Sequence, residues 1–147
     1  MKKIVFIFFI FIAVHRCFSQ SPQDSAAIRA TALNYAEGWY EGNPERMSKA
    51  VLPTLVKRIV GWSMDHTKNG NVIQEMNGEQ LVESTKKGFG KKTPKERQIK
   101  NITILSIYNN SASVKTEMAD WIDYMHLARW NGEWKIINVL WEMKPQE

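Results

Sequence analysis

The spacing of hydrophobic residues predicts that the fold begins with helices. Between residues 24 and 41, apolar side chains recur every three or four positions, as they do on one face of a helix. Asn43-Pro44 has the composition of a helix start and predicts a short helix over 44–50. Asn77, followed three residues later by Gln80, forms a capping-box pattern and predicts a third helix that ends near Gly88.

Alternating or continuous apolar runs predict strands in the rest of the chain. These runs cover residues 55–60, 72–76, 98–107, 111–118 and 121–141. Pro53 is expected to end the helical region before the first of them, and a polar turn is expected over 66–71. Asn131-Gly132 divides the last run and is the dipeptide that most favours a two-residue β-hairpin turn. Helices followed by an antiparallel meander predict an α+β domain.

The final hairpin also predicts which side chains share a face. If its strands pair in register outward from the turn, Tyr124 and His126 lie beside Trp141, whereas Asp123 lies on the other face with Leu140 opposite. Neither face has the composition of a solvent-exposed surface, and one layer of helices covers only one side of a sheet. We therefore expect a homodimer formed through the second face of the sheet.

Three segments carry a family resemblance: residues 38–47 (Gly-Trp-Tyr-Glu-Gly-Asn-Pro-Glu-Arg-Met), 110–117 (Asn-Ser-Ala-Ser-Val-Lys-Thr-Glu) and 123–138 of the hairpin. They resemble the NTF2-like superfamily, in which N-terminal helices pack on a curved antiparallel sheet to form a cone. Within it, the chain is similar to the exported bacterial family labelled "putative lumazine-binding", which has SnoaL-like relatives. The resemblance implies the fold more than the function, because the superfamily contains isomerases, dehydratases, cyclases, transport adaptors and binding domains.

The first residues have the pattern of an export signal. Two lysines precede an apolar run over 4–14, which is shorter than the roughly 20 residues that span a bilayer. Residues 17–19 then offer small side chains for cleavage. We expect 1–19 to be a signal peptide and 20–147 to form one domain, exported to the periplasm or secreted by a bacterium, with no membrane contact after cleavage. An uncleaved N-terminal anchor is the alternative.

Composition excludes several functions of the expected domain. Cys17 is the only cysteine and lies in the signal segment, so the domain has no disulfide, thiol nucleophile or cysteine-bound zinc. Part of the net charge of +5 also comes from that segment. The basic stretch 86–100 lacks interleaved aromatic residues except Phe89, so we expect a solvated helix end and loop there, and no nucleic-acid partner.

Asp120, Asp123 and His126 lie close in sequence without predicting a metal site. On a continuous strand Asp123 points away from the other two, which are about 20 Å apart at ~3.3 Å per residue. We expect neither a metal nor another cofactor.

Aromatic residues instead predict a pocket for a small, partly aromatic or heterocyclic molecule. Trp39 and Tyr40 lie near the end of the first helix, and Tyr124, His126 and Trp141 share the predicted hairpin face. Together they form the predicted ligand site. Packing in the core is the alternative explanation for the same residues.

Three functions remain open at this point. The first hypothesis is a non-enzymatic binding module. The second is a small isomerase, dehydratase or cyclase with Asp123 as base and Tyr124 or His126 as hydrogen-bond donor, although the predicted register opposes that pairing. A structural role for Asp123, paired with Arg129 or a backbone amide, is the alternative. The third hypothesis is an interaction-only dimeric domain whose pocket is filled by side chains.

Overall fold

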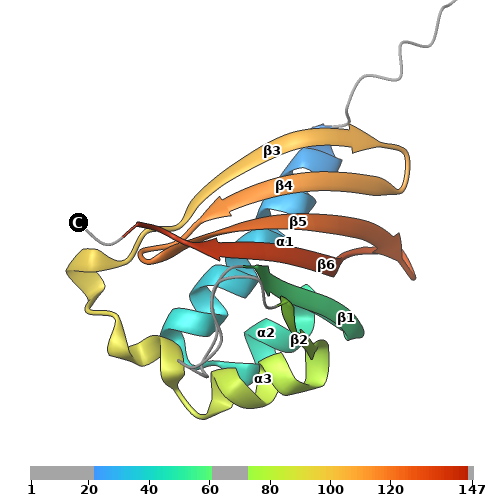
Figure 1. The fold of residues 1–147 in the computed structure, drawn as a ribbon. Coiled ribbons are helices and arrows are strands. Elements are labelled where there is room, and N and C mark those ends of the chain that lie inside the picture. The colour runs from blue at the N-terminus through green and yellow to red at the C-terminus, as the bar shows by residue number, and fades with distance from the viewer. Residues whose placement is uncertain (1–21, 61–72, 146–147) are drawn as a thin grey trace, which may run out of the picture.

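The structure, a computed structural model, describes residues 22–60 and 73–145 and places its helices against one face of a six-stranded sheet (Figure 1). The elements are α1 (Pro22–Glu41), α2 (Pro44–Ala50), β1 (Val51–Val60), β2 (Ile73–Asn77), α3 (Gly78–Lys86), the 3₁₀ turns η1 (Phe89–Lys92) and η2 (Lys95–Arg97), β3 (Asn101–Tyr108), β4 (Ser111–Glu117), β5 (Trp121–Trp130) and β6 (Glu133–Met143). This order confirms the predicted α+β class. The turn predicted over 66–71 lies outside the described residues. Within them, no helix is long and apolar enough to cross a membrane.

The predicted helix starts are present. The Asn43 side chain accepts a hydrogen bond from the backbone N–H of Arg46 at the start of α2. Asn77 and Gln80 form both hydrogen bonds of the capping box at the start of α3. These caps satisfy backbone N–H groups that the first helical turn leaves without a partner.

The sheet has the strand order β2-β1-β6-β5-β4-β3. All neighbouring strands are antiparallel except β1 and β6, which run parallel. The prediction that Pro53 precedes the first strand was wrong, because β1 begins at Val51 and includes this proline. The β1–β6 register is irregular between Val51 and Val56, and a strand tolerates a proline where ladder hydrogen bonds are interrupted.

One extra residue in β6 changes the register of the final hairpin. Pairing follows the prediction from the turn as far as Leu127, which lies opposite Ile136. The register then shifts, and His126 lies opposite Asn138, so Ile137 is left over on β6. A bulge of this kind moves all later residues of its strand to the opposite face from the one expected.

The predicted partition of the hairpin faces was therefore wrong for β6 beyond the bulge, whereas β5 alternates as predicted. Trp141 lies opposite Asp123, and these two side chains share the face toward the helices. Tyr124 lies opposite Leu140, and both are largely exposed on the other face together with His126. Asp123 and Trp141, which were predicted on opposite faces, therefore share a face. Tyr124 and His126, which were predicted beside Trp141, lie on the other side of the sheet from it.

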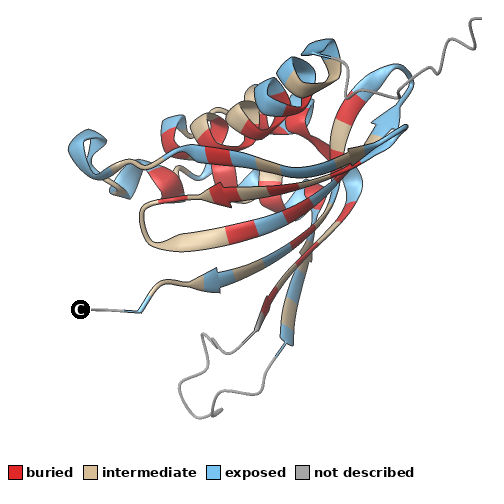
Figure 2. Cartoon of the chain, turned by 90° about the horizontal axis from the view of Figure 1, so that it is seen from above, coloured by how far each residue is buried: buried red, intermediate tan, exposed pale blue. Residues whose placement is uncertain are grey.

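The hydrophobic core lies between the helices and the inner face of the sheet, which we define as the face toward the helices. Figure 2 shows the buried residues concentrated between these two layers. Fully buried apolar side chains in this layer include Ile28, Ala32, Leu55, Val114, Met125, Leu127, Ile136 and Val139. Among the described residues, no helix lies over the outer face of the sheet.

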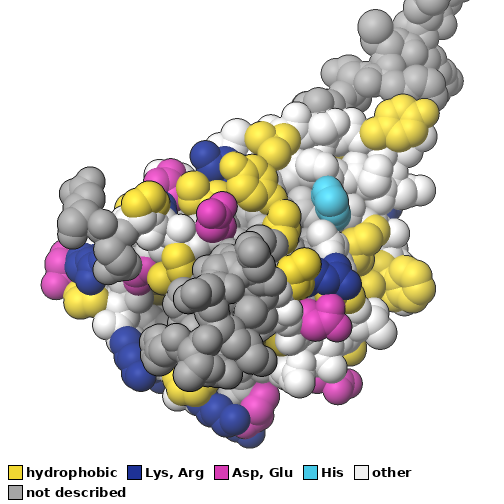
Figure 3. Space-filling view, viewed as in Figure 1, with side chains coloured by type: hydrophobic (Ala, Val, Ile, Leu, Met, Phe, Trp, Pro, Cys, Tyr) yellow, Lys and Arg dark blue, Asp and Glu magenta, His cyan; other side chains and the backbone are white. Residues whose placement is uncertain are grey.

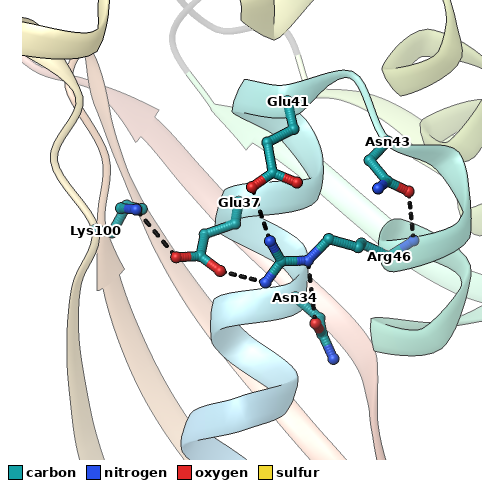
Figure 4. A network of polar contacts seen from close by, with 6 residues as sticks. All are labelled: Asn34, Glu37, Glu41, Asn43, Arg46 and Lys100. Atoms are coloured by element: carbon teal, nitrogen blue, oxygen red, sulfur yellow. Dashed lines mark hydrogen bonds and ion pairs between the residues drawn. The ribbon is translucent and has the colours of Figure 1, made fainter.

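A network of charged residues ties the end of α1 to α2 and to the segment before β3 (Figure 4). The Arg46 guanidinium pairs with Glu37 and with Glu41, and Lys100 pairs with Glu37 at 3.0 Å. The hydrogen bonds from Lys100 and Arg46 lower the pKa of Glu37 below its usual range. The network fixes the last turn of α1, which carries Trp39.

Candidate ligand-binding site

A cavity of about 400 Å³ lies between the helices and the inner face, where β5 begins and β6 ends. Aromatic rings from α1, η1, β5 and β6 form much of its wall. The lining residues are Tyr35, Trp39, Lys57, Met76, Leu81, Ser84, Phe89, Asp120, Trp121, Trp141 and Met143. A volume of roughly 300–1,000 Å³ with mostly apolar walls and few polar groups is typical of a small-molecule site.

Three tryptophans form one continuous side of the cavity. Trp39 and Trp121 pack edge to face, with ring centroids 6.0 Å apart and an interplanar angle of 85°. Trp121 and Trp141 pack in the same manner at 5.8 Å and 70°. Edge-to-face contacts are favourable because the positive ring edge meets the negative ring face. The rings therefore support one another, and the remaining faces can contact a ligand.

Tyr35, Lys57 and Asp123 form a buried polar triad beside these rings. The Lys57 ammonium donates hydrogen bonds of 2.6 Å to the Tyr35 hydroxyl and of 2.6 Å to Asp123 Oδ1. The Tyr35 hydroxyl donates to the same oxygen at 3.2 Å, and the Trp121 indole N–H donates to Asp123 Oδ2 at 2.9 Å. Both carboxylate oxygens are thus occupied, and the Asp123 side chain is fully buried.

Burial sets the protonation of the triad. It raises the pKa of Tyr35 well above its ordinary value, and the negative charge of Asp123 adds to this effect, so Tyr35 remains a neutral hydrogen-bond donor. Burial lowers the pKa of Lys57, while the Asp123 carboxylate opposes that shift. Lys57 Nζ also lies 4.7 Å from the centroid of the Trp141 ring, within cation–π range.

The hydrogen bonds from Lys57 to Tyr35 and Asp123 use two of its three N–H donors. An ammonium carries three donors, and Tyr35 and Asp123 accept two of them. The third can be directed to the Trp141 face or to an acceptor atom of a molecule in the cavity. Asp120 adds one acceptor to the lining and is held by Arg97 at 2.9 Å.

The structure divides the residues predicted to bind a ligand between two faces. Trp39 and Trp141 line the cavity. Tyr124 and His126 lie on the outer face, where the His126 ring is 3.3 Å from the Asn138 side chain. The predicted grouping of Tyr124 and His126 with Trp141 is not formed, because the bulge in β6 turns Trp141 inward.

Tyr40 has a packing role beside the cavity. Its ring is buried, its hydroxyl donates to the carbonyl of Ile99 at 3.0 Å, and it accepts from the backbone N–H of Ala119 at 2.9 Å. These bonds tie α1 to the segments that precede β3 and β5. Its hydroxyl is thus already engaged by backbone groups.

Asp123 does not form the pair expected with Arg129, because Arg129 pairs with Asp24. Its carboxylate binds the other two members of the triad and the Trp121 indole instead. Sequence reasoning missed Lys57 altogether. Its signal was present, since Leu55, Lys57 and Ile59 are the buried positions of an alternating strand, and a lysine at an inward position needs a buried partner.

The three residues weighed as metal ligands are separated in space. Asp120 lines the cavity, Asp123 lies within the triad, and His126 is on the outer face. Among residues 22–60 and 73–145, no three His, Cys, Asp or Glu side chains gather closely enough to hold a metal ion.

The buried pair should behave as a unit in unfolding experiments. Asp123→Leu leaves the Lys57 charge buried without its partner and should cost about 3–5 kcal/mol, whereas Lys57→Met/Asp123→Leu removes both charges and should recover most of that loss. Urea unfolding followed by tryptophan fluorescence measures both. As a control, Arg58→Met breaks the exposed Arg58–Glu75 pair and should cost less than about 1 kcal/mol. A double variant as unstable as the single variant would contradict this account.

The fold has close counterparts among solved structures. An NTF2-like protein of unknown function from Shewanella baltica OS155 has a TM-score of 0.65 at 18% identity, covering 87% of this chain and 99% of that one. Another from Silicibacter pomeroyi DSS-3 has a TM-score of 0.62 at 11% identity, covering 85% and 99%. A cystatin-like fold protein from Burkholderia xenovorans LB400 has a TM-score of 0.61 at 18% identity, covering 86% and 96%. At these identities the likeness shows the NTF2-like fold alone.

Sequence comparison adds the family. No curated protein matches the chain. Residues 23–142, which include every residue of the cavity lining except Met143, match the family described as putative lumazine-binding. The chain belongs to this putative lumazine-binding family, within the NTF2-like fold.

Proposed function

We propose that this chain is a non-enzymatic binding module for a small planar molecule, aromatic or heterocyclic, with a hydrogen-bond acceptor on one edge. The observation that carries the proposal is the position of Lys57, which belongs to the lining of a mostly apolar cavity rich in aromatic rings. Flat rings complement the tryptophan faces, and an acceptor atom complements the third N–H of Lys57. The family's description supports a heterocyclic ligand, since lumazine is a fused-ring heterocycle with carbonyl oxygens.

The charge of the site favours a ligand that is neutral or weakly acidic. Lys57 and Asp123 neutralise each other within the triad, and Asp120 is paired with Arg97. Asp120 can accept one hydrogen bond from a ligand N–H or O–H. A molecule that presents both an acceptor and a donor on its rim can thus bind both Lys57 and Asp120.

The triad does not favour Asp123 as the base of an isomerase, dehydratase or cyclase. Its oxygens already accept hydrogen bonds from Lys57, Tyr35 and Trp121, so neither is turned toward a substrate. The donors proposed to act with it, Tyr124 and His126, lie on the other side of the sheet. Binding therefore explains the arrangement better than direct proton abstraction.

We also propose that the domain is a homodimer through the outer face of the sheet. Tyr108, Tyr124 and Leu140 expose 74%, 49% and 45% of their surfaces there. Figure 3 shows hydrophobic side chains around a histidine on this face. Exposed apolar side chains grouped in this way are typical of an interface, and a second copy supplies a matching apolar surface by two-fold symmetry.

Export is part of the proposal and rests on the sequence. The basic, apolar and small-residue pattern of the first 19 residues supports delivery to the periplasm or the exterior of a bacterium. A domain without cysteine beyond that segment folds independently of the redox state of its compartment.

Ligand binding is tested by thermal unfolding in the presence of pteridines, flavins, steroids and polyketide-like aromatics. A true ligand at 100 times its Kd should stabilise the native state by about 2.7 kcal/mol. Trp39→Leu should weaken binding about tenfold or more because it removes one ring of the cavity. Trp130→Leu, which changes an exposed tryptophan at the hairpin turn, is the matched control. The proposal fails if no class binds, or if both variants weaken binding equally.

The dimer is tested by light scattering at micromolar concentration. The wild type should have twice the mass of one chain, and Leu140→Glu should shift it toward the monomer because a charge is placed within the apolar interface. Ile73→Glu, at an exposed position on the edge strand β2, should leave the mass unchanged. A wild-type monomer would overturn this proposal and leave the ligand proposal intact.

A further inference from the structure

We propose that Lys57 binds aldehyde or ketone ligands covalently, as a reversible imine between its Nζ and the carbonyl carbon of an aromatic molecule held in the cavity. The proposal rests on the proposed function, because the carbonyl group must first enter the same cavity. It assigns to Lys57 a nucleophilic role in addition to hydrogen bonding.

The position of Lys57 is the first support. Its side chain has only 6% of its surface exposed, yet it belongs to the cavity lining. A molecule in the cavity can thus contact an amine that bulk water barely reaches. Nζ is held in place by Tyr35 and Asp123 and lies over the Trp141 ring. A reacting group fixed in this way meets its target with less loss of entropy than a mobile surface lysine.

Stability alone does not account for a buried lysine at this position. Moving two charges from water into the protein interior is unfavourable, and their mutual attraction often fails to exceed that cost. Apolar residues at these positions of β1 and β5 would fill the same space without the cost of burying charge. Because Lys57 lines a cavity, we infer that the buried pair has a chemical role there.

The triad supplies the proton transfers that imine formation requires. Only the neutral amine is nucleophilic, and burial lowers the pKa of Lys57 toward that form. Asp123 Oδ1, 2.6 Å from Nζ, is positioned to accept the proton. Once Asp123 holds this proton, the neutral Tyr35 hydroxyl, 2.6 Å from Nζ, can turn its one O–H from Asp123 Oδ1 to the carbonyl oxygen as negative charge develops there.

The step balances in atoms and charge. Asp123 takes one proton from the ammonium, and the amine forms a C–N bond to the carbonyl carbon. The carbonyl oxygen becomes a hydroxyl by taking a second proton from nitrogen, through Tyr35. This hydroxyl then leaves as water with the proton held by Asp123, and the C–O bond breaks. The ammonium and carbonyl compound have become a protonated imine and one water molecule.

The product keeps the electrostatic balance of the site. The protonated imine carries the same positive charge as the ammonium it replaces, and Asp123 returns to the carboxylate. The buried charges therefore remain paired before and after the reaction, which avoids the large cost of an unpaired buried charge. The aromatic wall also limits the access of water that would hydrolyse the imine.

Reductive trapping tests the proposal directly. The protein is incubated with 2-naphthaldehyde and sodium cyanoborohydride, which reduces a protonated imine to a stable secondary amine. Intact mass and peptide mapping then locate the naphthylmethyl group. We expect Lys57 to be labelled at least about tenfold faster than Lys115, a lysine on β4, because only Lys57 combines a fixed, desolvated amine with a proton acceptor.

Variants and an unreactive analogue make the result specific. Lys57→Arg should abolish the fast adduct while keeping a positive charge beside Asp123, and Lys115→Arg should leave it unchanged. Competing 2-naphthylmethanol, which cannot form an imine, should slow the labelling of Lys57. Labelling spread evenly over surface lysines, or absent from Lys57 while the alcohol binds, overturns the inference and leaves the proposed function standing. Absence of both labelling and alcohol binding overturns both for this ligand class.

Discussion

The ion pair between Lys57 on β1 and Asp123 on β5 is the interaction around which the cavity end of the domain is organised. The two strands are not neighbours, because β6 runs between them, and the pair extends beside the Trp141 ring that β6 contributes. Tyr35 adds α1 to the same cluster. Polar contacts thus join α1 to β1 and β5 at the edge of the apolar core, next to the cavity. Each partner of the pair can remain charged there only because the other is in place.

One extra residue in β6 places Trp141 beside this cluster. Without the bulge at Ile137, Trp141 would face outward and the inner face would lose one of the three rings beside Lys57. Tyr124, His126 and Leu140 keep the outer face, which carries exposed apolar side chains suited to a partner. The two faces of the sheet therefore differ: the inner one shapes a pocket under the helices, and the outer one is the surface that we propose for the homodimer.

Most of the fold was predictable because its signals are local. The capping box at Asn77, the helix start at Asn43 and the turn at Asn131-Gly132 depend on residues adjacent in sequence, and each occurs in the structure. The candidate site depended on register and on long-range pairing. Ile136 and Ile137 are both apolar, so no change of pattern marks the bulge, and packing against the helices decides which one faces inward. Lys57 and Asp123 are 66 residues apart, a distance at which sequence spacing gives no information on contact.

The most direct test of the account is the state of the Lys57 side chain in solution, observed in ¹H–¹⁵N correlation spectra of protein labelled at lysine Nζ and assigned with Lys57→Arg. If the amine is buried between Asp123 and Tyr35 in the lining of a ligand cavity, its Nζ protons exchange slowly with water. They then give a signal separate from those of surface lysines. That signal should also shift when a ligand found by thermal unfolding is added. A Lys57 signal that exchanges as fast as surface lysines and does not respond to ligand would contradict the account.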